Sequence, residues 1–440
     1  MSTVENLFSF IKKSPSPFHA VSEITNILKE KGFTPLSEGE KWSLKKSGKY
    51  FVTRNSSSVI AFIIPENCSP KNGFLLTASH SDSPVFKIKE NPEIASAGSL
   101  VLNVEKYGGM LIQPWFDRPL SVAGRVIVRK NENGKSFLQQ VLVNIDRDLL
   151  MIPNLAIHMN REANEGHKID VQNEIRPLFT LNEKQKILSI VAESAGLAEK
   201  DIISHDLFLY NRSNPSLWGA ENEFISSPKL DDLECVWASL QGFLAAIESD
   251  SVCRPETSVH SLPLYCVFDN EEVGSSSRQG ADSTFLSDTL SRIAEKLDWT
   301  DEEYKIAISK SLMLSADNAH AVHPNYVSSA DPVNRPKVNG GIVIKFNAAQ
   351  KYTSDALSSA IFKEVCRKAE VPFQIYTNNS NVAGGSTLGN ISQNHVSLSC
   401  VDIGLAQWAM HSPYESAGAK DIDFMIRAVE EFYRTSMLVN

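Results

Sequence analysis

The chain has 440 residues, of which 42% are hydrophobic and 22% are charged, and its formal net charge at pH 7 is −9. This balance is that of an ordinary globular protein, and the length predicts two domains rather than one core. The negative charge argues against nucleic acid as the main partner, because a phosphate backbone requires a basic surface. No apolar run approaches the ~20 residues of a membrane span, so we predict a cytoplasmic protein without a membrane partner.

Helices and strands are predicted to alternate along most of the chain. Helices at 3–13 and 17–32 precede strands at 50–54, 59–65 and 73–79. After residue 226 the pattern continues with a helix at 231–248, a strand at 262–272, a helix at 282–297, strands at 311–320 and 340–347, a helix at 353–370, strands at 371–378 and 395–404, and a helix at 418–438. This alternation is typical of an α/β fold with a mostly parallel sheet flanked by helices.

Residues 88–226 have a different character. Segments such as GGMLIQPWF and GRVIVRKNENGKSF predict antiparallel strands joined by turns, and a helical stretch follows near 182–195. We therefore predict two domains. Residues 1–87 plus 227–440 form the α/β domain, and residues 88–226 form an inserted β-rich domain.

Three apolar strands each end in a polar cluster that contains acidic or histidine residues. These clusters are TASHSDSP, VFDNEEVGS and LSADNAH. In open α/β sheets, ligands bind outside the carboxyl ends of the strands. The repetition of such clusters at one topological position therefore predicts a functional site there, which a single cluster would not.

The residue types in these clusters suit zinc, which accepts imidazole nitrogen and carboxylate oxygen. His80, Glu272, Asp317 and His411 are candidate terminal ligands, and Asp231 in SPKLDDL is a candidate bridge. Two metals ~3.5–4 Å apart require such a shared ligand. The chain has no HExxH motif, which disfavours a single-metal zincin, and its cysteines form no CxxC pair, which disfavours a cysteine zinc site.

Two acidic positions next to the candidate ligands have alternative interpretations. Glu271 precedes Glu272 at a predicted strand end, where successive side chains point to opposite sides. Glu272 could then bind metal while Glu271 acts as general base, and the alternative is a solvated acidic turn. Asp82 follows His80 by two residues, so it is either a carboxylate that orients the His80 ring or a turn residue before Pro84.

Three further histidines have either a functional or a structural interpretation. His320 and His323, in NAHAVHPN, have the spacing of a metal-binding pair, and the alternative is that they shape the pocket beside Asp317. His158, in IPNLAIHMNRE, lies in the predicted inserted domain and is structural by default.

Six motifs in order resemble the aspartyl aminopeptidase family of two-zinc exopeptidases. They are TASHSDSP, PKLDDL, VFDNEEVGSSSRQGA, SADNAHAVHPNY, GGSTLGNI and QWAMHSPYE, and they extend from residue 77 to residue 415. The resemblance implies that His80, Asp317, His411 and Glu272 are terminal ligands and that Asp231, not Asp232, bridges. It also implies that Asp82 supports the site and that Glu271 shuttles the proton.

The resemblance further implies an assembly and a substrate. Family members form dodecamers built from dimers, in which a histidine in an IPNLAIH context reaches the active site of a neighbour, and His158 matches it. A lysine in a VIK context and a following tyrosine are associated with acidic substrate side chains, and Lys345 and Tyr352 match them.

The resulting prediction is a zinc aminopeptidase that binds two Zn²⁺ per subunit and releases N-terminal Asp or Glu from peptides with a free N-terminus. Cobalt or manganese are alternative metals, because the same donor atoms accept them. The alternatives for function are an aminopeptidase of the same family with neutral or basic preference, a two-zinc deacylase or carboxypeptidase, and a non-catalytic shell-forming protein.

Overall fold

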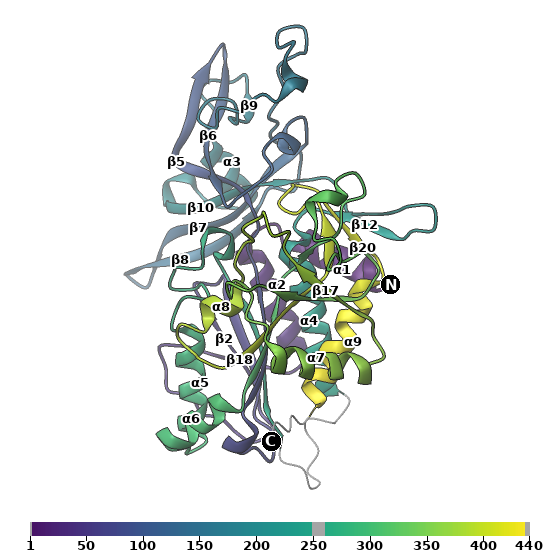
Figure 1. Ribbon diagram of the computed structural model, residues 1–440. Helices are drawn as coiled ribbons and strands as arrows, with labels where there is room; N and C mark the ends of the chain where they lie inside the picture. The colour runs from purple at the N-terminus through teal and green to yellow at the C-terminus, as the bar shows by residue number, and fades with distance from the viewer. Residues whose placement is uncertain (1, 249–259, 436–440) are drawn as a thin grey trace.

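The computed structural model describes residues 2–248 and 260–435. Its elements form three sheets with helices around the largest (Figure 1). Among the described residues, no helix is both long enough and apolar enough to cross a membrane. The mixed α/β fold predicted from the sequence is confirmed.

The largest sheet has nine strands and carries the central core. In spatial order the strands are β1 (Thr34–Leu36), β2 (Lys49–Arg54), β3 (Ser58–Ile63), β13 (Leu262–Phe268), β4 (Phe74–His80), β14 (Leu312–Ala316), β18 (Ser399–Gly404), β16 (Ile342–Phe346) and β17 (Phe373–Thr377). The central strands β13, β4, β14 and β18 are parallel. Every residue of β4, β13 and β14 is buried, which explains why these strands read as continuous apolar runs.

Helices cover both faces of this sheet. One apolar cluster joins one face to α1 (Thr3–Lys13), α2 (Pro17–Glu30), α4 (Leu230–Glu248), α7 (Ala356–Lys368) and α9 (Asp421–Arg434). A second cluster joins the other face to α5 (Phe285–Lys296), α6 (Asp301–Ser309) and α8 (Leu388–Ser392). The carboxyl ends of the central strands are left at one edge, where the loops that follow them meet.

The six-stranded sheet is antiparallel and draws all its strands from residues 85–211. Its spatial order is β8 (Lys135–Asn144), β7 (Leu120–Glu132), β10 (Ile202–Asn211), β5 (Val85–Ser96), β6 (Ser99–Tyr107) and β9 (Leu178–Thr180). It has its own apolar cluster, which includes α3 (Ile187–Ser194). Figure 1 shows this sheet at one end of the molecule, beyond the helices of the larger sheet. The domain boundaries at 87/88 and 226/227 remain a prediction.

The third sheet joins strands from distant parts of the chain. Its strands are β11 (Ser216–Trp218), β12 (Phe224–Ser227), β20 (Glu415–Gly418), β19 (Ala406–Trp408) and β15 (Ala319–His320). Because β12 pairs with β20, the residues just before α4 lie beside the residues just after His411. This pairing brings the PKLDDL and QWAMHSPYE motifs together.

Several predicted boundaries were wrong in an informative way. The predicted strand 262–272 ends at Phe268, because Asn270 adopts φ +64 and Glu271–Val273 form a 3-10 turn. The predicted strand 311–320 ends at Ala316, and the two-residue β15 follows it in another sheet. The closing helix begins at Asp421, and the last residues of the range 418–438 fall outside the described part of the chain.

Candidate metal centre

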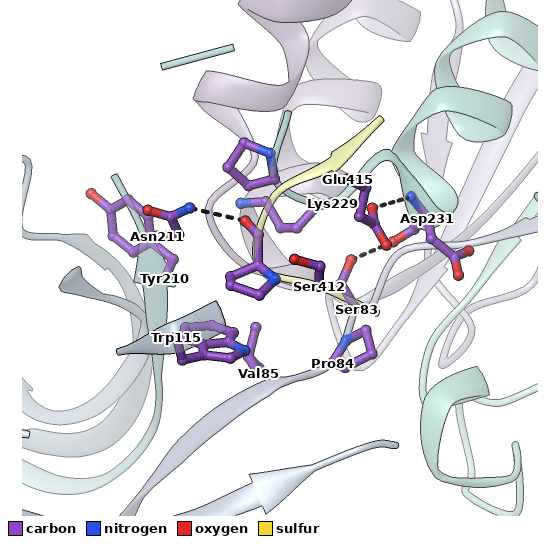
Figure 2. Close-up of a pocket in the computed structure, with 12 residues that line it drawn as sticks. Ser83, Pro84, Val85, Trp115, Tyr210, Asn211, Lys229, Asp231, Ser412 and Glu415 are labelled. Carbon is purple, nitrogen blue, oxygen red and sulfur yellow. Dashed lines mark hydrogen bonds between the residues drawn. The ribbon is translucent and has the colours of Figure 1, made fainter. Parts of the chain in front are cut away.

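The candidate ligands meet at the edge formed by the carboxyl ends of the central strands. His80 is the last residue of β4, and Asp317 directly follows β14. Glu272 lies in the turn after β13, and His411 lies in the loop between β19 and β20. Asp231 lies at the start of α4, where Figure 2 shows its backbone in contact with Ser83 and Glu415.

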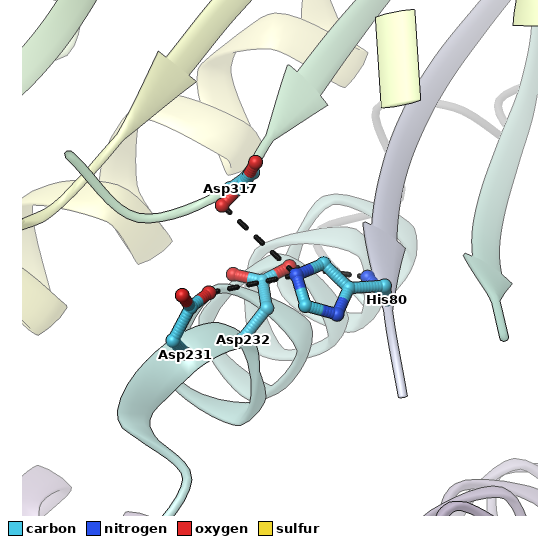
Figure 3. Close-up of side chains that lie close together, drawn as sticks. All are labelled: His80, Asp231, Asp232 and Asp317. Atoms are coloured by element: carbon cyan, nitrogen blue, oxygen red, sulfur yellow. Dashed lines mark hydrogen bonds and ion pairs between the residues drawn. The ribbon is translucent and has the colours of Figure 1, made fainter. Parts of the chain in front are cut away.

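His80 faces two carboxylates in a buried pocket (Figure 3). Its Nε2 lies 3.5 Å from Asp231 Oδ1 and 4.0 Å from Asp317 Oδ1. The exposed fractions of the three side chains are 1% for His80, 3% for Asp231 and 11% for Asp317. One nitrogen and two oxygens therefore converge in a space with little access to water.

His411 faces the other side of Asp231. Its Nε2 lies 3.4 Å from Asp231 Oδ2 and 3.3 Å from Glu272 Oε2. The two oxygens of Asp231 are thus directed at different imidazoles. Asp231 is the residue that belongs to both the group with His80 and Asp317 and the group with Glu272 and His411, each with ligand atoms within 4.8 Å of one another.

The donor atoms of both groups fit a divalent metal. Asp231 Oδ1 and Glu272 Oε1 are buried and accept no hydrogen bond within the described chain. Buried polar atoms in folded proteins are normally paired, so such orphaned oxygens call for an explanation. Imidazole nitrogens and carboxylate oxygens are the ligands that zinc takes when it uses no cysteine.

Asp232 also lies close to His80, but in a different way. Its Oδ2 accepts a hydrogen bond of 3.1 Å from the backbone N–H of His80, and it joins the His80 group by proximity. Unlike Asp231, it does not contribute to the group with His411. Of the two neighbouring aspartates, only Asp231 lies within reach of both imidazoles, as a shared ligand must.

Burial controls the electrostatics of the site. Burial raises the pKa of Glu271 to about 8, with Asp317 adding to the rise and His80 opposing it. Burial also raises the pKa of Glu272, where the charge of Asp231 is the next cause. Burial opposes ionisation of Asp231, but the two nearby imidazoles outweigh it and lower the pKa of Asp231. A bound cation would stabilise the ionised forms of these closely spaced carboxylates.

Asp82 connects the two sides of the site. Its Oδ1 lies 3.4 Å from His80 Nδ1 and accepts the backbone N–H of Glu271 at 3.1 Å. Its Oδ2 accepts the backbone N–H of Glu272 at 3.1 Å and the hydroxyl of Tyr107 at 2.7 Å. The backbone carbonyl oxygen of Asp82 lies 3.1 Å from His80 Nδ1, and the Asp82 carboxylate holds the turn that carries both glutamates. The orienting role of the Asp82 carboxylate remains a prediction.

The reasoning from strand geometry for the two glutamates was wrong. Glu271 and Glu272 lie in a 3-10 turn, so alternation along a strand does not separate them. Glu272 belongs to the group with Asp231 and His411, whereas both glutamates join His80 in another group. Glu272 is therefore distinguished from Glu271 by its place in the group with Asp231 and His411, and not by alternation along a strand.

The predicted substrate residues lie in different surroundings. His320 and His323 join no ligand group within the described chain and line a cavity of about 360 Å³ together with Tyr376. Lys345 is buried and donates to the carbonyl oxygen of Asp317 at 2.8 Å, and its Nζ lies 3.7 Å from Asp317 Oδ2.

Tyr352 and His158 complete the set. The ring of Tyr352 lies 5.2 Å below the Lys345 ammonium and 6.2 Å from the ring of Tyr376. His158 is exposed on the long connection between β8 and β9 and belongs to none of the ligand groups. A role in a neighbouring subunit requires an exposed position of this kind.

The sequence did not reveal three positions that touch the candidate ligands or Asp82. Tyr107 donates to Asp82, Gly109 accepts a hydrogen bond from His411 Nδ1 through its carbonyl oxygen, and Glu415 accepts the backbone N–H of His411. The glycine pair in YGGM is the one sequence signal near Tyr107 and Gly109. Gly108 has φ +82, and a Cβ added there would lie 3.1 Å from Glu272 Cβ, so this position favours glycine. Glu415 is the last residue of the QWAMHSPYE motif, but the motif by itself assigned it no role.

Known proteins are similar to this chain along nearly its whole length. A family model described as aminopeptidase I zinc metalloprotease (M18) matches residues 10–433. The chain is 47% identical over 437 residues to a probable M18 family aminopeptidase 2 of Clostridium acetobutylicum, covering 98% of each protein. It is 40% identical over 441 residues to one of Pseudomonas aeruginosa, covering 99% of this chain and 98% of the relative.

Solved structures are similar along nearly the whole chain. A chain from the cryo-EM structure of the Ape4 and Nbr1 complex aligns with a TM-score of 0.93 at 35% identity, covering 98% of this chain and 85% of that one. The S. cerevisiae mApe1 dodecamer aligns with a TM-score of 0.85 at 25% identity, covering 98% and 97%.

Proposed function

The chain belongs to the M18 family and is a zinc metalloaminopeptidase, and from this premise we propose that it uses two metal ions to release N-terminal Asp or Glu from peptides. Asp231 carries the two-metal part of the proposal, because its two oxygens face His80 and His411 on opposite sides. His80 and Asp317 would hold one metal and Glu272 and His411 the other. Zinc is the metal that the family indicates, and cobalt or manganese suit the same donors.

Residues of the protein would transfer the proton and position the ligands. When bound, zinc supplies Lewis-acid polarisation of the scissile carbonyl and a lowered water pKa. Glu271 lies beside the ligands and would take the proton of the attacking water and pass it to the leaving amine. Asp82 would hold His80 and the turn of Glu271 in place. Exclusion of water around His80 strengthens these electrostatic interactions.

Replacing Glu271 tests this mechanism. Glu271→Gln should keep both metals and lose about 10²–10⁴-fold in turnover, the usual scale for a general base. Glu272→Gln is the matched control in the same turn, and it should lose metal as well as activity. Metal content by elemental analysis and turnover on an aminoacyl chromogenic substrate separate the two. Near-wild-type turnover in a metal-replete Glu271→Gln enzyme would exclude the assignment.

The substrate preference depends on Lys345 and Tyr352, with His320 and His323 on the neighbouring cavity wall. The Lys345 ammonium already contacts Asp317, so its charge serves a substrate carboxylate only if it faces the cavity as well. Asp-, Glu-, Leu- and Lys-aminoacyl substrates should show whether acidic residues are cleaved best. Preferred cleavage of Leu or Lys would favour the alternative of a neutral or basic preference.

An N-acetylated peptide separates an aminopeptidase from a two-zinc deacylase or carboxypeptidase, since it lacks the free amine. We expect it to remain uncleaved. Binding of the unblocked peptide without any cleavage, by protein that contains both metals, would favour a non-catalytic shell-forming protein instead.

We further propose a cytoplasmic dodecamer built from dimers, with residues 88–226 as the dimerisation domain. The likeness to the mApe1 dodecamer supports this assembly. His158, exposed on that domain, would reach the active site of a neighbouring subunit. The mass of the purified particle tests the assembly. His158→Ala should then lower activity while leaving the particle mass unchanged.

A further inference from the structure

One buried carboxylate contacts the backbone of two candidate metal ligands at once. Glu415, the first residue of β20, is 1% exposed. Its Oε2 accepts the backbone N–H of Asp231 at 3.0 Å, and its Oε1 accepts the backbone N–H of His411 at 2.7 Å. A single side chain therefore links ligands that lie 180 positions apart in the chain, as the difference between 411 and 231 shows.

Both backbone amides lie where regular structure does not hold them. Asp231 is at the start of α4 but has non-helical φ and ψ of −82° and 106°, and the first N–H groups of a helix lack partners within it. His411 has φ +67, a conformation that is unfavourable for a residue with a side chain. Glu415 can therefore stabilise two irregular positions together.

We propose that Glu415 is a positioning residue that fixes the bridging ligand Asp231 and the terminal ligand His411 relative to each other. The proposal rests on the ligand roles assigned above. Ser83 assists by donating its hydroxyl to the carbonyl oxygen of Asp231 at 2.8 Å, so that both sides of this peptide are held (Figure 2). The spacing of the two halves of the metal site then depends on one carboxylate.

The surroundings of Glu415 exclude a direct part in the chemistry. The cavity beside it has a volume of about 10 Å³ and is walled by Ser83, Lys229, Asp231 and Pro413. A cavity of this size holds one water at most and no part of a peptide. Glu415 therefore acts through Asp231 and His411 and does not touch the substrate.

The chain contains a matched control for the same hydrogen-bond pattern. Asp421, at the start of α9, is buried and also accepts two backbone N–H groups. Its Oδ2 accepts from Asn339 at 2.6 Å and its Oδ1 from Gly341 at 2.9 Å. Asp421 belongs to none of the ligand groups, so its loss should destabilise the fold without disturbing the metals.

The test compares Glu415→Gln with Asp421→Asn. In each variant an amide NH₂ replaces one acceptor and faces a backbone donor, so both metal-free proteins should melt at lower temperature than the wild type. Zinc affinity is measured by competition with a chelating dye. Glu415→Gln should bind at least one zinc about 10–100-fold more weakly, the usual cost of losing a group that orients ligands. Asp421→Asn should bind zinc as the wild type does.

The outcomes separate this inference from the proposed function. Unchanged zinc affinity in Glu415→Gln, with a lowered melting temperature, would show a merely structural role and overturn the inference. Equal weakening in Asp421→Asn would overturn it too. A wild-type protein that binds fewer than two zinc ions would instead refute the two-metal proposal on which the inference depends. If Glu415→Gln does not fold, Glu415→Asp, whose shorter side chain cannot reach both amides, is judged by the same criteria.

Discussion

The two sides of Asp231 are built differently. On one side, His80 ends a fully buried strand and Asp317 directly follows another, so the central sheet itself positions them. On the other side, Glu272 lies in a 3-10 turn and His411 in a loop, with 34% of the His411 side chain exposed. A rigid sheet needs few additional contacts to position a ligand, whereas turns and loops must be fixed by groups outside them.

Those outside groups come from the six-stranded sheet as well as from Glu415. Directly after β6, the carbonyl oxygen of Gly109 accepts from His411 Nδ1, and the backbone N–H of Leu111 donates to the carbonyl oxygen of His411 at 3.1 Å. The first contact directs His411 Nε2 toward Asp231 and Glu272, as ligating histidines require. The loop side of the metal site therefore depends on a segment that follows a different sheet.

The largest expected effects come from removing one histidine on each side. His80→Ala should lose the metal held with Asp317 and retain the one held with Glu272, and His411→Ala should do the reverse. Metal-free His80→Ala should also be the less stable variant, because it removes the buried imidazole from beside Asp231 and Asp317, a type of loss that costs about 3–5 kcal/mol. Elemental analysis gives the metal content, and thermal melting gives the stability.

The results for His80→Ala and His411→Ala can contradict the distinction drawn between the two sides of Asp231. If both variants lose both metals, the two sides are not separable and bind cooperatively. If His411→Ala destabilises the metal-free protein more than His80→Ala, burial at the strand ends is not what distinguishes the two sides.

A smaller effect is expected from Tyr107, at the end of β6. Its hydroxyl donates to Asp82 at 2.7 Å and accepts from the side chain of Asn270 at 2.7 Å. Tyr107→Phe should leave the turn of Glu271 less well held and reduce metal affinity or turnover by about 10–100-fold, the range for partners of ligating groups. Steady-state kinetics and zinc competition measure this effect.

Tyr210→Phe is the control for Tyr107→Phe, because Tyr210 also lies in the six-stranded sheet but its hydroxyl donates to Asn144, away from the ligands. If both variants behave alike, the effect is one of general stability. If Tyr107→Phe matches the wild type, the six-stranded sheet does not support the site through Asp82.

The same difference between the two sides explains what the sequence could predict. Fully buried strands produce continuous apolar runs, and the polar residues after them stand out, so His80, Glu272 and Asp317 could be identified as candidates from the pattern alone. Asp231 and His411 lie in no such cluster, and the assignment of all five residues as one set depended on ordered motifs that resemble a known family. The contacts of Tyr107 with Asp82 and of Glu415 with Asp231 join residues far apart in the chain, and no local periodicity records them.

The smallest expected effect is a pH dependence of the melting temperature caused by His19. It sets the pH range in which the stabilities of the His80 and His411 variants can be compared. His19 in α2 lies outside the ligand groups, and burial, followed by the charge of Lys229, lowers its pKa from 6.5 to about 4. Since the unfolded chain takes up this proton first, the contribution of His19 to stability is complete above pH 6.5 and is lost as the pH falls toward 4. His19→Gln should therefore flatten the fall in melting temperature over this range relative to the wild type. Parallel curves of melting temperature against pH for metal-free wild type and metal-free His19→Gln would refute this prediction. The His80 and His411 variants are best compared above pH 6.5, where His19 contributes equally to the stability of both.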